Sequence, residues 1–139
     1  MHLLVSGIKK WALKAYVKPV FKKRRYDSVV YHLVPEVSKA QQLIDSRKSI
    51  DLLVLGGVSA KDFGSESSEC ENYWEYLAFA QKNPRIPSII LIYGVDLAVR
   101  NSLDHKHPPN FACYFSEFES MTREQIDLVL KGRNLAWRD

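Results

Sequence analysis

Residues 50–58, IDLLVLGGV, form an almost wholly apolar run that includes two glycines near its end. A short run rich in Leu, Ile and Val is typical of a strand buried on both faces, as in a parallel sheet covered by helices. The run predicts a strand over Ile50–Leu55. The chain then places Gly56 and Gly57 at its carboxyl end, where strands of such sheets deliver their functional side chains.

Apolar runs alternate with helical patterns along the rest of the chain. Strands are expected at His2–Ser6, Ser28–Val34, Ile50–Leu55, Pro87–Tyr93 and Phe111–Phe115. Helices are expected at Lys9–Arg25, Pro35–Ser46, Glu71–Lys82, Val95–Asp104 and, capped by Thr122, Thr122–Arg133. Since parallel neighbours need crossovers of about a dozen residues, the alternation predicts an α/β fold. We expect one doubly wound, flavodoxin-like domain over residues 1–139, a five-stranded parallel sheet in the order 2-1-3-4-5 with helices on both faces.

Two local details qualify the expected helices. Pro19 lies inside the first helix and predicts a kink or an early break there. The helix Glu71–Lys82 is rich in aromatic residues that span more than one face, and we expect two of them to pack on the sheet. These residues are Tyr73, Trp74, Tyr76 and Phe79.

Composition argues for a globular protein without a membrane span. Hydrophobic residues make up 46% of the chain, which suits an ordinary core. The longest apolar stretch, around Ile89–Val95, is far shorter than the roughly 18 residues that cross a bilayer. Lys9 and Lys10 interrupt the N-terminal apolar patch, which argues against a secretory signal. Cys70 and Cys113 form no CxxC pair and suit a reduced, cytoplasmic protein.

Positive charge is concentrated in the first predicted helix. Eight basic residues and no acidic residue lie between Lys9 and Arg25, whereas the rest of the chain has twelve basic and sixteen acidic residues. Helical spacing places five of the cations on one stripe beside an apolar face. These five are Lys10, Lys14, Lys18, Lys22 and Arg25.

The charged stripe has a structural and a functional interpretation. A solvated helix face is the simplest one, and a docking surface for an acidic protein partner is the functional hypothesis. Nucleic-acid binding through this helix is the weaker alternative, because Trp11 is the only aromatic residue placed to stack on bases. Membrane binding is disfavoured because the apolar face of the helix is committed to the core.

Other motifs give weaker signals. Asp104, His105 and His107 match no zinc spacing, so no metal is expected. The pair Gly56-Gly57 lacks the spacing of a phosphate-binding loop, and no cofactor is expected. Ligands in this architecture bind at the carboxyl ends of the strands, so a small-ligand or enzymatic site at that crevice is an alternative.

The stretches SIDLLVLGG (49–57) and IPSIILIYG (86–94), with the order and lengths of the elements, resemble the third and fourth strands of a CheY-like receiver domain of response regulators. The resemblance implies a site with two Mg²⁺-binding acids, a phosphoacceptor Asp, a Ser or Thr, and a Lys. This chain departs from that pattern at every position. The corresponding residues are Ser6, Gly7, Gly56, Tyr93 and Ser116.

Phosphoryl transfer needs a nucleophile, a metal held by carboxylates and a cation for the developing charge, and glycine supplies none of these. The resemblance therefore implies a degenerate pseudo-receiver, a non-enzymatic signalling module regulated by partner binding. Weaker similarity links it to the pseudo-receiver domains of the circadian clock proteins KaiA and CikA. The face of the fourth helix, fifth strand and last helix would be a second contact surface, suited to a homodimer.

Overall fold

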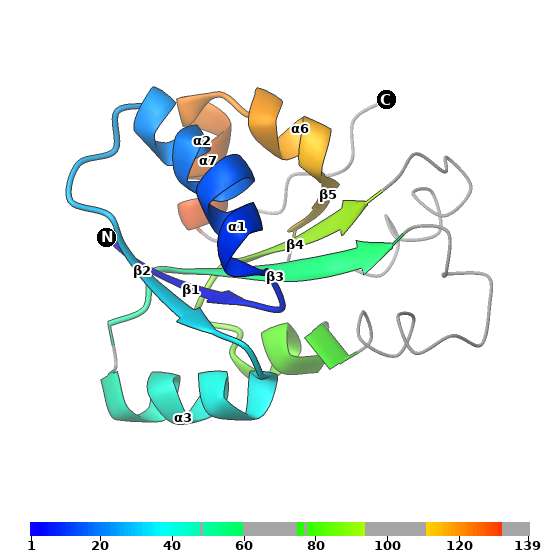
Figure 1. The fold of residues 1–139 in the computed structure, drawn as a ribbon. Coiled ribbons are helices and arrows are strands. Elements are labelled where there is room, and N and C mark those ends of the chain that lie inside the picture. Colours follow the sequence, from blue (N-terminus) through cyan, green and yellow to red (C-terminus); the bar gives the residue numbers. More distant parts are fainter. Residues whose placement is uncertain (48, 60–74, 77, 94–110, 132–139) are drawn as a thin grey trace.

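A parallel β-sheet organises the computed structural model, which describes residues 1–47, 49–59, 75–76, 78–93 and 111–131 (Figure 1). Its strands are β1 (His2–Ser6), β2 (Val30–Val34), β3 (Leu52–Ser59), β4 (Ser88–Tyr93) and β5 (Phe111–Tyr114). The order is β2-β1-β3-β4-β5, and every neighbouring pair is parallel. The predicted α/β class and the parallel order 2-1-3-4 are confirmed. β5 pairs with β4 at the other edge of the sheet.

Helices lie on both sides of this sheet in Figure 1. The first helical segment comprises α1 (Lys10–Ala12), a π-helical turn (Leu13–Val17) and α2 (Lys18–Lys23). It shares one side with α6 (Phe115–Ser120) and α7 (Arg123–Leu130). The other side carries α3 (Val37–Arg47) and the helical residues 75–76 and 78–82.

The core is built on the central strands. Their apolar residues are fully buried whichever face they point to, as expected for strands covered on both sides. Burying each such Leu or Ile stabilises the fold by roughly 1.5–3 kcal/mol. The buried strand residues are Leu3, Leu4 and Val5 in β1, Leu52, Leu53, Val54 and Leu55 in β3, and Ile89, Ile90 and Leu91 in β4.

The first helical segment departs from a regular α-helix at its centre. Pro19 has no N–H and could not donate to the carbonyl four residues back. The structure places a π-helical turn directly before it and Pro19 in the first turn of α2. Leu13, at the start of the π turn, and Phe21, in α2, both remain buried. The predicted irregularity at Pro19 is thus present as a π turn.

Several predicted boundaries are wrong. β3 continues through both glycines to Ser59 instead of ending at Leu55, with an irregular register between Gly56 and Val58. The segment Phe115–Ser120 is a helix, α6, that the pattern did not predict. The predicted helix Val95–Asp104 lies outside the described residues, as does most of the N-terminal half of Glu71–Lys82.

The start of α7 is confirmed in detail. The Thr122 hydroxyl accepts a hydrogen bond from the backbone N–H of Gln125 at 3.1 Å. The Gln125 side chain in turn accepts from the Thr122 N–H at 2.9 Å. This capping box satisfies two donors that would otherwise be unpaired at the helix N-terminus.

Candidate functional site

The end of β1 and the middle of β3 bring three of the predicted site residues together. Ser6 pairs with Leu55, which places Gly7 beside Gly56. A Cβ atom on Gly7 would lie 2.5 Å from the carbonyl oxygen of Gly56, so the two backbones are in close contact. Ser6 itself is fully buried. The positions that would hold metal and phosphoacceptor in a receiver are therefore adjacent here.

The other two predicted positions, Tyr93 and Ser116, have no such contact with Gly7 or Gly56 among the described contacts. Tyr93 ends β4 and pairs with Ser59, near the end of β3, and its side chain is outside the described part of the structure. Ser116 lies in α6, so its backbone is helical, not in a loop after β5. The loop with Asp104, His105 and His107 is not among the described residues.

Tyr76 is the site residue that the sequence analysis missed. Its hydroxyl lies against Gly7: a Cβ atom on Gly7 would collide with Tyr76 Oη and lie 2.6 Å from Cζ. Burial, and then the charge of Glu75, raises the pKa of this phenol. The tyrosine therefore fills space that a side chain at position 7 would take. The signal that could have found it is the presence of glycines at the ends of two adjacent strands.

Carboxylates do not gather at this rim within the described residues. Asp51 lies at the opposite end of β3, where it accepts a hydrogen bond from the His2 N–H at 2.7 Å. Across the part of the chain that the structure describes, no three His, Cys, Asp or Glu side chains are grouped so that they could hold a metal ion.

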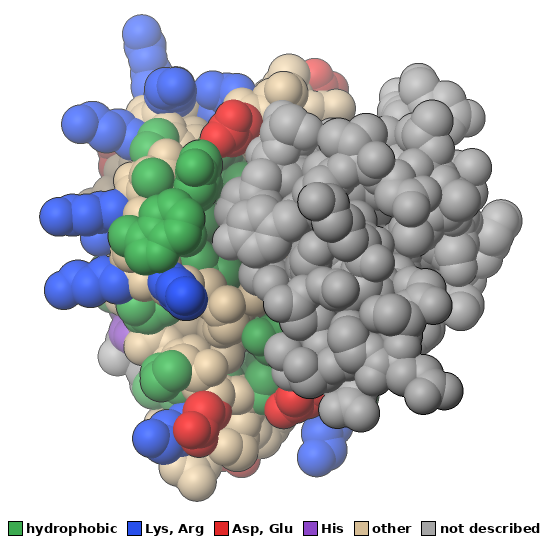
Figure 2. Space-filling view, turned by 45° about the vertical axis from the view of Figure 1, so that its right-hand side comes forward, with side chains coloured by type: hydrophobic (Ala, Val, Ile, Leu, Met, Phe, Trp, Pro, Cys, Tyr) green, Lys and Arg blue, Asp and Glu red, His purple; other side chains and the backbone are tan. Residues whose placement is uncertain are grey.

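The predicted basic stripe lies on the surface. All five of its residues, Lys10, Lys14, Lys18, Lys22 and Arg25, are exposed. Figure 2 shows Lys and Arg side chains projecting along one side of the molecule, next to hydrophobic side chains. In a regular α-helix a spacing of four residues drifts by about 40° per step. The π turn holds an extra residue per turn and so reduces this drift along the stripe.

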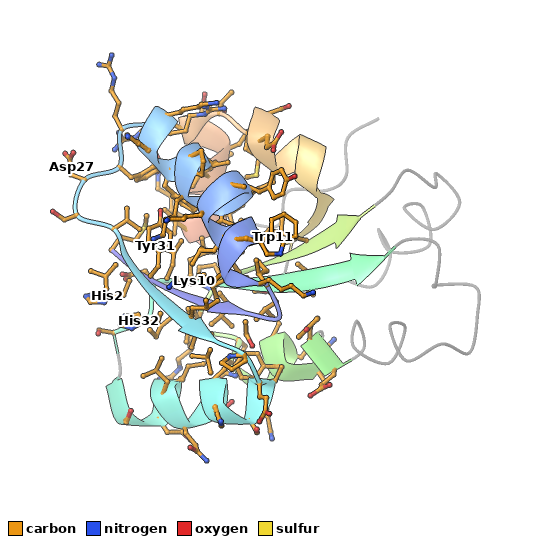
Figure 3. All side chains as sticks on the ribbon, viewed as in Figure 1. His2, Lys10, Trp11, Asp27, Tyr31 and His32 are labelled. Carbon is orange, nitrogen blue, oxygen red and sulfur yellow. The ribbon has the colours of Figure 1, made fainter. Side chains whose placement is uncertain are left out.

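A groove of about 970 Å³ runs between the basic stripe and β2. Asp27 is the only carboxylate among its lining residues, against four cations. The Lys18 ammonium lies 5.3 Å from the centre of the Tyr31 ring, a cation–π contact across the groove. Burial raises the pKa of Tyr31 to about 12, which keeps the phenol neutral. Figure 3 labels Asp27 and Tyr31 on this side of the sheet. The lining residues are Lys14, Lys18, Pro19, Phe21, Lys22, Arg25, Tyr26, Asp27, Val29 and Tyr31.

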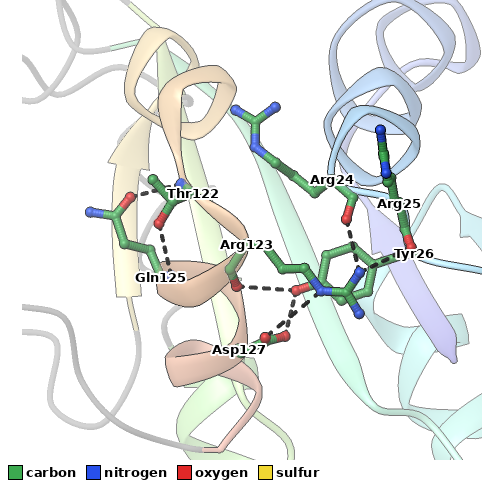
Figure 4. Close-up of polar contacts among 7 residues, drawn as sticks. All are labelled: Arg24, Arg25, Tyr26, Thr122, Arg123, Gln125 and Asp127. Atoms are coloured by element: carbon green, nitrogen blue, oxygen red, sulfur yellow. Dashed lines mark hydrogen bonds and ion pairs between the residues drawn. The ribbon is translucent and has the colours of Figure 1, made fainter.

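One wall of this α2–β2 groove is fixed to the C-terminal helices by Arg24. Its guanidinium donates to the carbonyl oxygens of Met121 at 2.7 Å and Glu119 at 3.0 Å. In the opposite direction, the Arg123 guanidinium donates hydrogen bonds to the carbonyl oxygens of Arg24 and Arg25, each at 3.1 Å (Figure 4). Arg24 is therefore a structural residue, distinct from the exposed cations beside it.

Tyr26 completes this attachment. Its hydroxyl donates to the Asp127 carboxylate at 2.5 Å, and the Arg123 guanidinium lies 4.5 Å from the ring centre (Figure 4). Burial, followed by the hydrogen bond to Asp127, raises the pKa of Tyr26 well above its usual value. Tyr26, which lines the groove, is thus held to α7 by two contacts.

Arg25 occupies a backbone conformation that usually belongs to glycine. Its φ is 59°. The N–H of Tyr26 donates to the Phe21 carbonyl and that of Arg25 to the Lys22 carbonyl, both at 3.1 Å, which is the Schellman pattern of helix ends. The Phe21 and Tyr26 rings, 5.7 Å apart, supply the hydrophobic contact that accompanies it. An arginine at this position keeps a cation on the groove at the expense of backbone strain.

Arg25→Gly should therefore raise the free energy of unfolding by about 0.5–1 kcal/mol, because glycine adopts positive φ without a steric penalty. Urea denaturation followed by circular dichroism measures this change. Arg25→Ala is the matched control: it removes the same charge but keeps a Cβ atom, so it should give no gain. Equal stabilisation by both substitutions would show that charge repulsion, and not φ, is the cause.

Comparison with known proteins adds no relative: no family model, curated protein or solved structure matches this chain. Among the described residues, no helix combines the length and the apolar character needed to cross a membrane.

Proposed function

We propose that this chain is a non-enzymatic signalling module of the pseudo-receiver type, which acts by binding a protein partner instead of by accepting a phosphoryl group. The parallel sheet order supports the resemblance to a doubly wound, flavodoxin-like receiver fold. The proposal has two parts. The position of the phosphorylation site lacks the side chains that accept a phosphoryl group, and a basic surface binds the partner.

The observation that carries the first part is the contact among Gly7, Gly56 and Tyr76. Glycine has no side chain to act as nucleophile or metal ligand, and the phenol lies where a side chain at position 7 would be. This packing also counts against the alternative of a small-ligand or enzymatic site next to Gly7 and Gly56. Such a site would need open space and convergent polar groups.

The second part is supported by the basic stripe and the α2–β2 groove. Four exposed cations line one groove with a single carboxylate. A long-range attraction toward an acidic protein surface follows from that charge distribution, and it would weaken with ionic strength. Lys10, at the start of the helix, extends the same surface.

Incubation with acetyl phosphate and Mg²⁺ tests the loss of phosphoryl chemistry. We expect the intact mass of the protein to stay unchanged, because the described residues hold no group of carboxylates that could bind the metal which this chemistry needs. A receiver domain with its phosphoacceptor Asp, treated in the same tube, confirms that the reagent is active. A phosphoryl adduct on an Asp of this chain would contradict the proposed function.

A further inference from the structure

One edge of the described sheet lies beside the basic stripe. β2 is the outermost strand, next to β1. The Val30 N–H donates to the Met1 carbonyl at 2.9 Å, so Val30 directs its backbone groups toward β1. Alternate residues of a parallel strand face the same neighbour. Tyr31 and Leu33 therefore direct their N–H and C=O groups away from β1, toward the edge.

This edge carries few of the features that prevent strands from pairing. β2 reads VYHLV and contains no Lys, Glu or Pro. Val30 and Leu33 are 42% and 36% exposed, although both are large hydrophobic residues. Among the described residues, these backbone donors and acceptors have no partner strand, and such a row next to exposed apolar side chains is a template for a further strand. Within the described part of the chain, β1 is the only strand that pairs with β2.

The charges around the edge select the kind of strand that can be added. Side chains alternate along β2, so Tyr31 and Leu33 point to one face, and Tyr31 lines the α2–β2 groove. An added strand would lie about 4.8 Å from β2 and turn every second side chain to that same face. Acidic side chains there would meet Lys18, Lys22 and Arg25. A second copy of this chain would instead bring two basic stripes together.

We propose that β2 accepts an extended, acidic segment of a partner protein as an added strand. Its backbone pairs with Tyr31 and Leu33, and its carboxylates lie against the cations of the α2–β2 groove. Backbone pairing of this kind supplies affinity, and the alternating side chains supply selectivity. The inference rests on the proposed docking function and specifies its occupant.

A synthetic peptide tests the proposal directly. The probe is a fluorescein-labelled octapeptide of alternating Glu and Val, and the readout is fluorescence anisotropy with the full chain. We expect saturable binding that K14E/K18E/K22E weakens by about tenfold, since each exposed ion pair contributes up to about 1 kcal/mol. The matched control K39E/K82E/K131E makes the same charge change at exposed lysines elsewhere and should bind the peptide nearly as the parent does.

Two further measurements separate strand pairing from simple charge attraction. Methylating alternate peptide nitrogens removes the donors that a strand needs, and should abolish most of the binding. Amide hydrogen exchange, read by NMR, should slow by about tenfold or more at Tyr31 and Leu33 on peptide binding. The amide of Val30, already bonded to β1, should change little. Circular dichroism confirms that each variant is folded.

Three results would contradict the proposed strand addition, and each identifies a different cause. Binding that survives N-methylation, or that leaves Tyr31 and Leu33 unprotected, would overturn strand addition but leave charge-driven docking intact. Tighter binding of an oligodeoxythymidine, lost in K14E/K18E/K22E, would assign the surface to nucleic acid and overturn both. Protection of Tyr31 and Leu33 that rises with protein concentration alone would identify a second copy as the occupant. The acetyl phosphate result is independent of all three.

Discussion

Replacing Gly7 by alanine should lower the free energy of unfolding by about 3 kcal/mol or more, and urea denaturation at neutral pH will measure the loss. Two penalties act together. The φ of Gly7 is +79°, a region that costs an L-residue about 1–2 kcal/mol. The new methyl would also overlap Tyr76 and lie 2.5 Å from the Gly56 carbonyl oxygen, and overpacking typically costs about 1–3 kcal/mol.

A double-mutant cycle with Tyr76→Ala separates these two penalties. Removing the phenol opens space for the new methyl, so Gly7→Ala should cost about 1 kcal/mol less in that background. The remainder is the backbone penalty and the contact with Gly56, neither of which the second substitution relieves. A Gly7→Ala variant as stable as the parent would show that the tyrosine does not occupy this position in solution.

Gly56→Asp places an aspartate at the position where a receiver domain has its phosphoacceptor. We expect this substitution to destabilise the fold by about 2–3 kcal/mol and not to restore phosphorylation. A Cβ atom at position 56 would lie 2.7 Å from the Leu91 carbonyl oxygen and 2.9 Å from the Leu91 Cβ. Gly56 and Leu91 are direct partners across β3 and β4, so neither backbone can withdraw without disturbing the central ladder. Chemical denaturation measures the loss, and mass spectrometry after acetyl phosphate treatment tests the chemistry.

Gly56→Ala is the control for this experiment, because its added atom is the Cβ itself. Its destabilisation should match that of the aspartate to within about 1 kcal/mol if the close approach of β4 is the cause. An aspartate variant with the stability of the parent, or one that gains a phosphoryl group, would contradict the interpretation. The glycine at position 56 would then reflect a simple loss of a side chain within an unchanged backbone.

The sheet was predictable because its signals are local. The runs at Ile50–Leu55 and Pro87–Tyr93 are too apolar for an exposed strand, and their spacing requires crossovers. The same local reasoning ended β3 too early, because glycine disfavours strand interiors. β3 continues because it stays paired with β4 through Gly56 to Ser59. Leu91 of β4 approaches Gly56 too closely for any side chain, a tertiary contact that the sequence does not display.

The helix ends, and the packing of Tyr76 against Gly7, were predictable only in part. The first helix was predicted to end at Arg25 and ends at Lys23, because arginine occupies the left-handed position where glycine would have marked the boundary. The capping residue Thr122 carried its own signal and was placed correctly. Tyr76 was recognised as one of four aromatic residues. Its contact with Gly7 joins positions 69 residues apart, and spacing within a helix cannot reveal such a contact.

The hydrogen bonds from Arg24 and Arg123 have a mechanical consequence. They fasten the first helical segment to α6 and α7, across more than 90 residues of sequence. The end of α2 cannot move away from α6 and α7 without breaking these bonds, so local unfolding at either place should be coupled to the other. The first and last described helices should melt in a single step, as one cooperative body.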